Sequence, residues 1–328
     1  MKNARAEILS LLNEKKSSGS PAFSGLIHIT TQGLQSEGLA LHGVHHEAEK
    51  MAKAAASTFQ LTGLPSATLP LDLSAEAEAL GAVLDFSHDD RFPLPTAPLV
   101  ASVKDIVIPS DAITRGRLPV IQQAIANLKQ DIGNEVVISG MIPGPFTLLL
   151  LLVEPGRLFG EMKKEPGAVN QVLEQLSHFL AQTGAAYKNA GADFITIHDM
   201  GGSPGFIGPA KYEQFVFPAE KQLIQELPKP CVLSVCGNVN KSIDMLAQTG
   251  ADAISVDQTS DLAASRKILT DTLLFGNIDP VATLWQGDAA QITESVLGAK
   301  EAGVDAVWLG CDLVIETPIK SLVSMCKA

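Results

Sequence analysis

The 328-residue sequence contains only four cysteines, too few for a disulfide-stabilised scaffold in a chain of this length. A reducing, cytoplasmic location is therefore expected. Aromatic residues are also scarce, at 5% of the sequence, although hydrophobic residues make up 46%. This composition is typical of a large α/β enzyme, and it argues against a β-sandwich or a disordered chain.

Basic residues are also fewer than acidic ones. Lysine and arginine number 24 against 36 aspartates and glutamates, which gives a formal net charge of −12. An acidic chain is repelled by nucleic acids and by anionic membrane surfaces, so we expect neither as a partner. The longest apolar run, residues 146–153, is far shorter than the about 20 residues that span a bilayer, and the N-terminus lacks the apolar stretch of a signal peptide. We therefore expect no membrane insertion.

The sequence does contain a weak internal repeat. A Gly-x-Asp triplet followed by a short apolar run occurs at residues 191–197, 250–256 and 303–309. Each copy follows a helical pattern, and glycine is the preferred residue just past the end of a helix. The repeat therefore predicts a helix, a glycine cap and a buried strand. We interpret the three aspartates, Asp193, Asp252 and Asp305, as structural residues at the start of each strand.

Eight segments are candidate strands, at residues 24–30, 67–73, 135–141, 193–198, 231–236, 252–257, 272–276 and 305–310. Helical patterns lie between most of them, which favours parallel strands joined by crossover helices. Eight such units predict an α/β fold of the (β/α)8, or TIM-barrel, type. An open doubly wound sheet is the alternative, and the absence of a Gly-x-Gly-x-x-Gly turn after a strand disfavours it.

Two regions do not fit a minimal barrel. Residues 1–20 predict an N-terminal helix outside the barrel, which ends at a Ser-Ser-Gly-Ser-Pro segment. Residues 82–118 are rich in proline and aspartate and show little helical periodicity. We interpret them as an insertion after the second strand, with a hairpin near the barrel mouth. No linker is evident, so the whole chain, residues 1–328, is expected to form a single barrel domain.

Two cysteines, Cys236 and Cys311, each follow a short apolar run where a strand should end. The carboxyl ends of barrel strands meet at one rim, so these two residues are expected to be close in space. Two converging thiolates suit a soft metal ion, above all Zn²⁺. The alternative is that each cysteine is a small buried hydrophobic residue, which is our interpretation of Cys231 and Cys326.

Further polar residues lie in or after the predicted strands. They are His28, Glu76, His198, Asp199, Asp257 and Asn277. Any one of them is compatible with a helix cap or a loop anchor, and their number at strand ends indicates a functional site. His198 is equally compatible with a structural role and with a role as ligand or base. His42, His45 and His46 are expected to cap the following helix or to line the mouth.

In these motifs the chain resembles the uroporphyrinogen decarboxylase superfamily, and within it the methylcobamide:coenzyme M methyltransferase-like branch. The resemblance covers roughly residues 40–326. The matching segments are residues 75–81, 144–147, 191–193, 212–215, 236–238, 276–280, 310–311 and 316–318. Each is short, but their order and spacing together are fairly specific.

The resemblance implies a zinc site at the barrel mouth, held by a His-x-Cys pair and a distant cysteine. The two cysteines correspond to Cys236 and Cys311, but Ser234 occupies the position of the histidine. A serine hydroxyl is a poorer zinc ligand than an imidazole. His198 is the best replacement because its strand is expected to neighbour that of Cys236. The predicted metal ligands are therefore Cys236, Cys311 and His198.

The remaining polar residues receive weaker assignments. Glu76 and Asp257 are predicted catalytic-site residues that orient the substrate or support the ligands. His28, Asp199 and Asn277 are predicted to contact the substrate. His28, Glu76 and Asp257 are also weaker candidates for the missing zinc ligand.

The resemblance further implies a zinc-dependent methyltransferase that moves a methyl group between a corrinoid and a small substrate. The substrate is a thiol acceptor such as coenzyme M, which zinc would deprotonate, or a methyl ether donor, which zinc would polarise. The methylcobalamin-type corrinoid is expected on a separate partner protein, since no segment is typical of a cobalamin-binding domain.

Two alternatives remain open. The first is a decarboxylase-type lyase, which the absence of arginine from residues 22–46 disfavours, because guanidinium groups are needed to hold several carboxylates. The second is a non-catalytic barrel that binds a corrinoid protein, which only the serine at position 234 supports.

Overall fold

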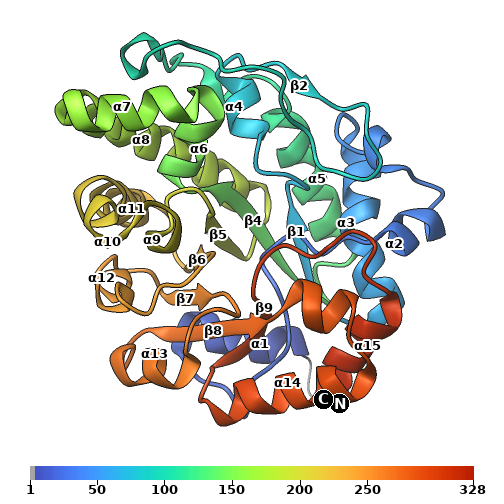
Figure 1. Ribbon diagram of the computed structural model, residues 1–328. Helices are drawn as coiled ribbons and strands as arrows, with labels where there is room; N and C mark the ends of the chain where they lie inside the picture. The colour runs from blue at the N-terminus through green and yellow to red at the C-terminus, as the bar shows by residue number, and fades with distance from the viewer. Residues whose placement is uncertain (1–3) are drawn as a thin grey trace.

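The computed structural model describes residues 4–328 and contains one curled parallel sheet of seven strands (Figure 1). The strands are β1 (Ser66–Leu69), β4 (Val137–Pro143), β5 (Phe194–Asp199), β6 (Cys231–Val235), β7 (Ala253–Val256), β8 (Leu273–Ile278) and β9 (Ala306–Leu309). They lie side by side in chain order, with every neighbouring pair parallel. This order lacks the reversal of a doubly wound sheet and is typical of a barrel-like α/β fold.

Helices and short turns connect the strands (Figure 1). The longer helices are α1 (Ala4–Glu14), α3 (Ala48–Thr62), α5 (Leu118–Asp131), α7 (Pro155–Lys164), α8 (Pro166–Ala190), α11 (Phe217–Glu226), α14 (Ala289–Glu301) and α15 (Ile319–Lys327). The shorter helices are α2 (Thr31–Ser36), α4 (Ala75–Ala79), α6 (Pro145–Leu152), α9 (Pro204–Ile207), α10 (Pro209–Lys211), α12 (Ile243–Ala247) and α13 (Leu262–Ile268). Two π-helical turns, Tyr212–Val216 and Pro280–Trp285, complete the connections after β5 and β8. Among the helices of residues 4–328, none has the length and apolar character needed to cross a bilayer.

The Gly-x-Asp repeat has the structural role expected of it. In each copy the aspartate accepts a hydrogen bond from a backbone N–H of the preceding strand, at 2.8–2.9 Å. The three pairs are Asp193 with Ile138, Asp252 with Cys231, and Asp305 with Leu274. The three preceding glycines have φ values between 85° and 123°, which a residue with a Cβ rarely adopts. The glycines of the first and third copies lie at the ends of α8 and α14, and all three aspartates align the amino ends of adjacent strands.

The first predicted strand, residues 24–30, is not formed as a regular strand, which corrects the expectation for that segment. The chain nevertheless lies between the two edges of the sheet. Ala22 forms an isolated parallel bridge with Val307 of β9, and the Ser24 N–H donates to Ser66 Oγ of β1 at 2.9 Å. Because a side-chain oxygen replaces the backbone acceptor on the β1 side, the hydrogen-bond ladder does not continue there.

Aromatic rings fill part of the space enclosed by the curled sheet. The rings are Phe23, Phe194, Phe275 and Trp308, with centroid separations of 5.1–6.2 Å. Phe194 on β5 and Trp308 on β9 come from strands that are not neighbours, so they meet across the interior. Alternate residues of a strand point to the same face, so Thr196 and His198 on β5 continue this interior face toward the carboxyl end.

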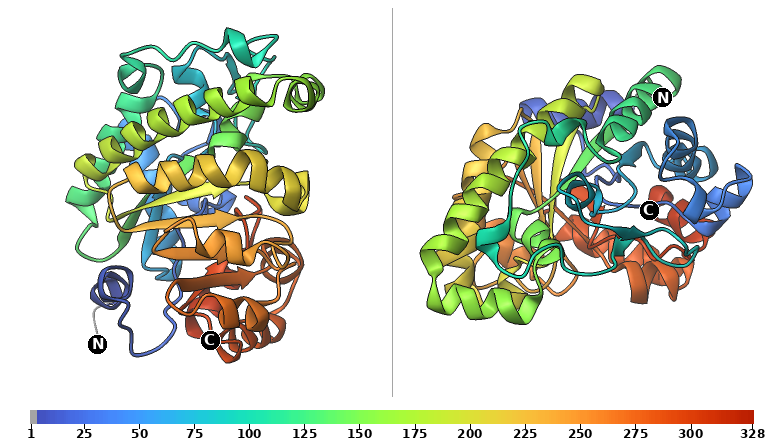
Figure 2. Two further views of the ribbon diagram at one scale, coloured as in Figure 1. Left: turned by 90° about the vertical axis from the view of Figure 1, so that its left-hand side faces the viewer. Right: turned by 90° about the horizontal axis from the view of Figure 1, so that it is seen from above.

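The two extra regions lie at different places in the fold. Helix α1 lies near the amino ends of the strands, where Arg5 pairs with Asp193 at 2.7 Å. Residues 82–117 contain a small antiparallel hairpin, β2 (Leu84–Asp85) and β3 (Leu94–Pro95). Three 3-10 turns, Leu41–Gly43, Val103–Asp105 and Ala112–Thr114, lie in the loops before α3 and before α5. Figure 2 shows the molecule from two further sides, with the long α8 running across the outside of the sheet.

Candidate metal centre

Three strand ends bring His198, Cys236 and Cys311 together. The Sγ atoms of Cys236 and Cys311 lie 2.8 Å apart, although the residues are 75 positions apart in the chain. His198 Nε2 lies 3.2 Å from Cys236 Sγ and 3.9 Å from Cys311 Sγ. Within residues 4–328 this is the one group of three or more potential metal ligands whose atoms all lie within 4.8 Å of one another. We refer to these three residues as the sulfur–imidazole cluster.

Glycines beside the two cysteines shape the turns that present the thiols. Gly237, directly after Cys236, has a φ of 81°, which allows the chain to turn sharply as β6 ends. Gly310, directly before Cys311, lies so close to the Gln258 side chain that a Cβ atom there would be 2.7 Å from its Oε1. The Cys-Gly and Gly-Cys pairs of the sequence are therefore both required by the local backbone.

His198 lies directly across from Ser234 in the ladder between β5 and β6. Adjacent strands are about 4.8 Å apart, so a side chain on β5 at this level reaches the same space as one on β6. His198 is completely buried, and its Nε2 faces the sulfur of Cys236. The imidazole thus reaches the thiols from the neighbouring strand, at the level where the sequence has serine.

The donor set fits a zinc ion. Zn–S bonds of about 2.3 Å and Zn–N bonds of about 2.0 Å in a tetrahedron place two sulfurs about 3.8 Å apart and sulfur and nitrogen about 3.5 Å apart. The two nitrogen–sulfur distances, 3.2 and 3.9 Å, lie on either side of that value. The sulfurs are closer, at 2.8 Å, and would separate by about 1 Å around an ion. Two thiolates and one imidazole leave a fourth position open, as in catalytic zinc sites.

The charges in the sulfur–imidazole cluster are strongly coupled. A hydrogen bond from the Cys236 thiol, reinforced by His198, lowers the pKa of Cys311 to about 5. The same hydrogen bond, together with burial, raises the pKa of Cys236 well above its ordinary value. Burial opposes the charged form of His198, but Asp312 and Cys311 outweigh it and raise its pKa to about 9. Without a metal, the cluster therefore holds a thiolate beside an imidazolium at neutral pH.

Asp257 and Asn277 hold the loops around the cluster. Asp257 accepts hydrogen bonds from the backbone N–H of Gly237 and from both the N–H and the hydroxyl of Thr259. Asn277 donates from Nδ2 to the backbone carbonyls of Asp257 and Ser260, at 3.1 and 3.2 Å. Asp257 thus fixes the turn after β6, and the Asn277 amide is engaged by the protein itself.

Glu76 is not brought to the sulfur–imidazole cluster. It lies on α4, is completely buried, and accepts a hydrogen bond from the Tyr187 hydroxyl of α8 at 3.2 Å. Burial, with a smaller contribution from Asp72, raises its pKa to about 8. The structure therefore places Glu76 between helices, and its contacts give no support to a catalytic role.

A buried ion-pair network that sequence analysis missed lies beside Glu76. Arg117 donates to both carboxylate oxygens of Asp72, at 2.7 and 3.0 Å, and to Glu78 at 2.7 Å. His45 Nδ1 lies 3.2 Å from Asp72, and the guanidinium stacks over Phe86 at 4.8 Å. We refer to these five residues as the Arg117 cluster. Its members come from distant parts of the chain, so no local sequence pattern predicts the cluster.

His28 and Asp199 are also occupied by the protein. The ring nitrogens of His28 face the backbone carbonyls of Leu26 and Ser66, at 2.6 and 3.1 Å. Asp199 accepts hydrogen bonds from the Thr147 hydroxyl, at 2.5 Å, and from a backbone N–H. Since successive residues of β5 point to opposite faces, Asp199 points away from the face that carries His198. Neither side chain is brought to the ligand atoms.

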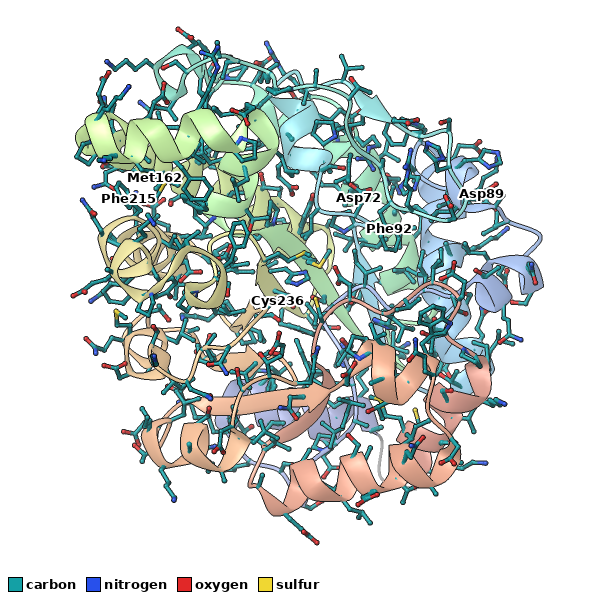
Figure 3. The ribbon with its side chains drawn as sticks, in the orientation of Figure 1. Asp72, Asp89, Phe92, Met162, Phe215 and Cys236 are labelled. Carbon is teal, nitrogen blue, oxygen red and sulfur yellow. The ribbon has the colours of Figure 1, made fainter. Side chains whose placement is uncertain are left out.

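Of the two roles expected of the three N-terminal histidines, capping the following helix or lining the mouth, the first is wrong. The residue that caps α3 is Glu47, and it makes no side-chain capping bond. His42 pairs with Asp89 at 2.8 Å on the surface, and His45 belongs to the Arg117 cluster. Figure 3 shows Asp89 at the edge of the molecule and Cys236 near its centre.

The other two cysteines have the properties expected of structural residues. Burial raises the pKa of Cys231 and of Cys326 to about 11. Their thiols are therefore protonated at neutral pH, whereas a metal ligand or nucleophile must be a thiolate. Cys231 opens β6, at the opposite end of that strand from Cys236.

The chain is similar to known proteins over most of its length. The methylcobamide:CoM methyltransferase MtbA of Methanosarcina mazei is 29% identical over 300 residues, covering 90% of this chain and 88% of that protein. MtaA of Methanosarcina barkeri is 30% identical over 298 residues, covering 89% and 87%. A solved structure, a methyltransferase from Methanosarcina mazei, superimposes with a TM-score of 0.94 at 26% identity, over 98% of this chain and 97% of that one.

These matches confirm the resemblance inferred from the sequence motifs. The family described as uroporphyrinogen decarboxylase (URO-D) matches residues 4–328, the whole of the chain that the structure describes. The chain therefore belongs to the URO-D family.

Proposed function

We propose that this protein is a zinc-dependent methyltransferase that moves a methyl group between a corrinoid, carried by a separate protein, and a small thiol or methyl ether. The names of its relatives support methyl transfer, since those proteins are methylcobamide:coenzyme M methyltransferases. A further relative, from Methanosarcina mazei, is a methylated-thiol–coenzyme M methyltransferase.

The convergence of one imidazole and two thiols is the observation that carries the proposal. His198 Nε2 and the sulfurs of Cys236 and Cys311 would hold the ion, each from the end of a different strand. A bound zinc ion supplies a Lewis acid that lowers the pKa of a coordinated thiol or polarises an ether oxygen. The chain supplies three ligands and leaves one position for the substrate.

Metal binding depends on the protonation of the ligands and on the turn that carries Cys236. Before metal enters, Cys236 and His198 carry protons, and both must leave for their lone pairs to bind an ion. Asp257 fixes the turn that carries Cys236 through its bond to the N–H of Gly237. The burial of His198 keeps water away from one side of the cluster.

The finer features of the fold fit the same proposal. Residues 21–28 take the place of an eighth strand and complete a single (β/α)8 domain, because they are bonded to both β9 and β1. Residues 82–118 form an insertion near the mouth. A pocket of about 270 Å³ lies between residues 90–92 and residues 313–316, the loop that follows Cys311. This rim is where we expect the corrinoid protein to dock.

Metal content and methyl transfer test the proposal together. The purified protein should contain one zinc per chain, and with methylcobalamin as donor it should methylate at least one member of a thiol panel that includes coenzyme M. The ether direction is tested with methyl ethers and cobalt(I) cobalamin. Chelation should abolish both directions, and zinc should restore them. Full methyl transfer by zinc-free protein would refute the role of the metal.

Moving the imidazole from position 198 to position 234 tests the ligand set. His198→Ala should weaken zinc binding, and adding Ser234→His in the same chain should restore it, since the two positions face each other in the ladder. Ser234→His alone is the matched control for the added ring. If the double substitution binds zinc no better than His198→Ala, the proposed geometry of the site is wrong.

The same measurements distinguish the alternatives. A lyase of the decarboxylase type predicts release of carbon dioxide from an acid substrate that persists after chelation. A non-catalytic barrel predicts association with a corrinoid protein but no metal and no methyl transfer.

A further inference from the structure

Asp312, to which sequence analysis gave no role, lies behind the imidazole of His198. Its Oδ2 is 3.4 Å from His198 Nδ1, at the outer limit of hydrogen-bonding distance. The other ring nitrogen, Nε2, faces the sulfur of Cys236 at 3.2 Å. The ring therefore lies between a carboxylate on one side and the two thiols on the other. The one sequence signal for Asp312 is its position directly after Cys311.

The protein backbone holds the Asp312 carboxylate in place. Its Oδ1 accepts a hydrogen bond from the N–H of Ile27 at 2.9 Å. The next residue, Leu313, donates its N–H to the carbonyl of Ile27, also at 2.9 Å. Two bonds to one residue of the segment between β9 and β1 thus fix the loop that carries the carboxylate. The ion pair that the structure gives Asp312 is with His198.

Asp312 is the carboxylate that pairs with His198 Nδ1. The nitrogen is buried and makes no hydrogen bond of ordinary geometry within residues 4–328. The adjacent carboxylate on the strand, Asp199, is engaged by Thr147 and points to the opposite face. A buried imidazole N–H without an acceptor is costly, so a proton on Nδ1 depends on Asp312 as its acceptor, while a proton on Nε2 points at the sulfurs.

We infer that Asp312 is a positioning residue that keeps the proton of the neutral His198 ring on Nδ1 and so leaves the Nε2 lone pair directed at the thiols. In metal sites, a carboxylate behind a histidine ligand fixes both the tautomer and the ring orientation. The consequence for metal binding rests on the proposed function, but the tautomer itself does not require a metal.

Asp312→Asn is the sharpest perturbation. The amide retains an oxygen that accepts from Ile27, and it directs an NH2 group at His198 Nδ1. A neutral ring then accepts at Nδ1 and carries its proton on Nε2, pointing at the sulfurs. The substitution is almost isosteric, so it changes the tautomer with little change in packing.

Nitrogen-15 NMR of the metal-free protein with labelled histidine measures the tautomer. The spectra are recorded at a pH at which the chemical shifts of both ring nitrogens show that His198 is neutral. We expect Nδ1–H in the wild-type protein and Nε2–H in Asp312→Asn, with His198→Ala identifying the signal. Asp312→Glu, which keeps a carboxylate, should preserve Nδ1–H.

Zinc affinity, measured by competition with a chelator, provides the second readout. Asp312→Asn should bind zinc about 10- to 100-fold more weakly, and Asp312→Glu should recover part of the loss. Asp279→Asn is the matched control, because Asp279 accepts hydrogen bonds only from the backbone N–H groups of Val281 and Ala282. Its affinity should equal that of the wild type.

A wild-type ring protonated on Nε2, or an Asp312→Asn protein with unchanged tautomer, overturns the inference. If the wild type takes up no zinc but its tautomer follows residue 312 as expected, the inference stands and the proposed function fails. If zinc binds but the tautomer of His198 is the same whichever residue stands at position 312, the inference fails and the proposed function stands.

Discussion

The Arg117 cluster and the sulfur–imidazole cluster are both buried and polar, but their groups are arranged differently. The Arg117 cluster contains opposite charges that satisfy one another, since the guanidinium is shared between Asp72 and Glu78. The sulfur–imidazole cluster contains three potential metal ligands whose atoms converge on the same small space. The first network is complete within the protein. In the sulfur–imidazole cluster, Cys236 and His198 carry protons that the proposed zinc ion would replace.

Perturbed pKa values alone do not separate these two regions. Glu76, beside the Arg117 cluster, has a pKa raised to about 8, and His198 has a pKa raised to about 9. The causes differ, since burial acts on Glu76 while nearby anions act on His198. The comparison teaches that the convergence of ligand atoms, and not the size of a pKa shift, distinguishes the candidate site from a structural cluster in this fold.

Removing the thiols should produce the largest functional effect. Cys236→Ala with Cys311→Ala should abolish zinc binding and slow methyl transfer by about 1,000-fold or more, because the loss of a Lewis acid costs several kcal/mol of transition-state stabilisation. Elemental analysis and a methylcobalamin-dependent assay measure the two effects. Cys231→Ala with Cys326→Ala is the control and should retain both properties. Zinc retained by the first double variant would refute the ligand assignment.

Breaking the Arg117 cluster should affect stability instead. Arg117→Met leaves the buried Asp72 without its partner and should lower the free energy of unfolding by about 3–5 kcal/mol, measured in urea. Zinc per folded chain should be unchanged. Arg115→Met, which removes an exposed pair with Asp111, is the matched control and should cost less than about 1 kcal/mol. Loss of zinc from folded Arg117→Met protein would show that the two clusters are one unit.

The pH dependence of stability should depend on Glu76. Because its pKa is raised to about 8 in the folded protein, the folded state retains a proton that the unfolded state loses near the ordinary glutamate pKa of 4.5. The contribution of Glu76 to stability is then greatest at low pH and falls by roughly 3 kcal/mol between pH 5 and pH 8. Glu76→Gln should reduce the fall in stability by about this amount in urea titrations, while Glu49→Gln on the exposed face of α3 should leave it unchanged. An equal slope in both variants would contradict the burial argument.

Zinc affinity should respond to pH in the opposite direction. Cys236 and His198 both have raised pKa values and must lose their protons to bind, so affinity should rise with pH. With two protons released, the gain is about 100-fold between pH 7 and pH 8, or about 2.7 kcal/mol. Calorimetry in buffers of different ionisation enthalpy counts the protons. Zinc uptake without proton release would mean that the metal binds elsewhere.

Much of this architecture was predictable from sequence because it depends on local patterns. The Gly-x-Asp repeat indicated the strands of the second half, and seven of the eight predicted strands overlap observed ones. The cysteine pair was predictable for the same reason. Both residues end apolar runs, and parallel strands bring such ends together.

Other features depend on tertiary contacts that local patterns do not encode. Residues 24–30 have the apolar character of a strand, yet Ser24 bonds to a side chain of β1 in place of its backbone. Glu76 follows a strand as a catalytic residue would, but the adjacent helix supplies Tyr187 as its partner. The role of Asp312 depends on its closeness to His198, which is more than one hundred positions away in the chain.

X-ray absorption at the zinc edge tests the central claim most directly. For the zinc-loaded protein, the account predicts two sulfurs at about 2.3 Å and one imidazole nitrogen at about 2.0–2.1 Å, with a lighter atom in the fourth position. Substitution of His198 by alanine should remove the imidazole signal and leave both sulfurs. A first shell of oxygen and nitrogen without sulfur would contradict the account.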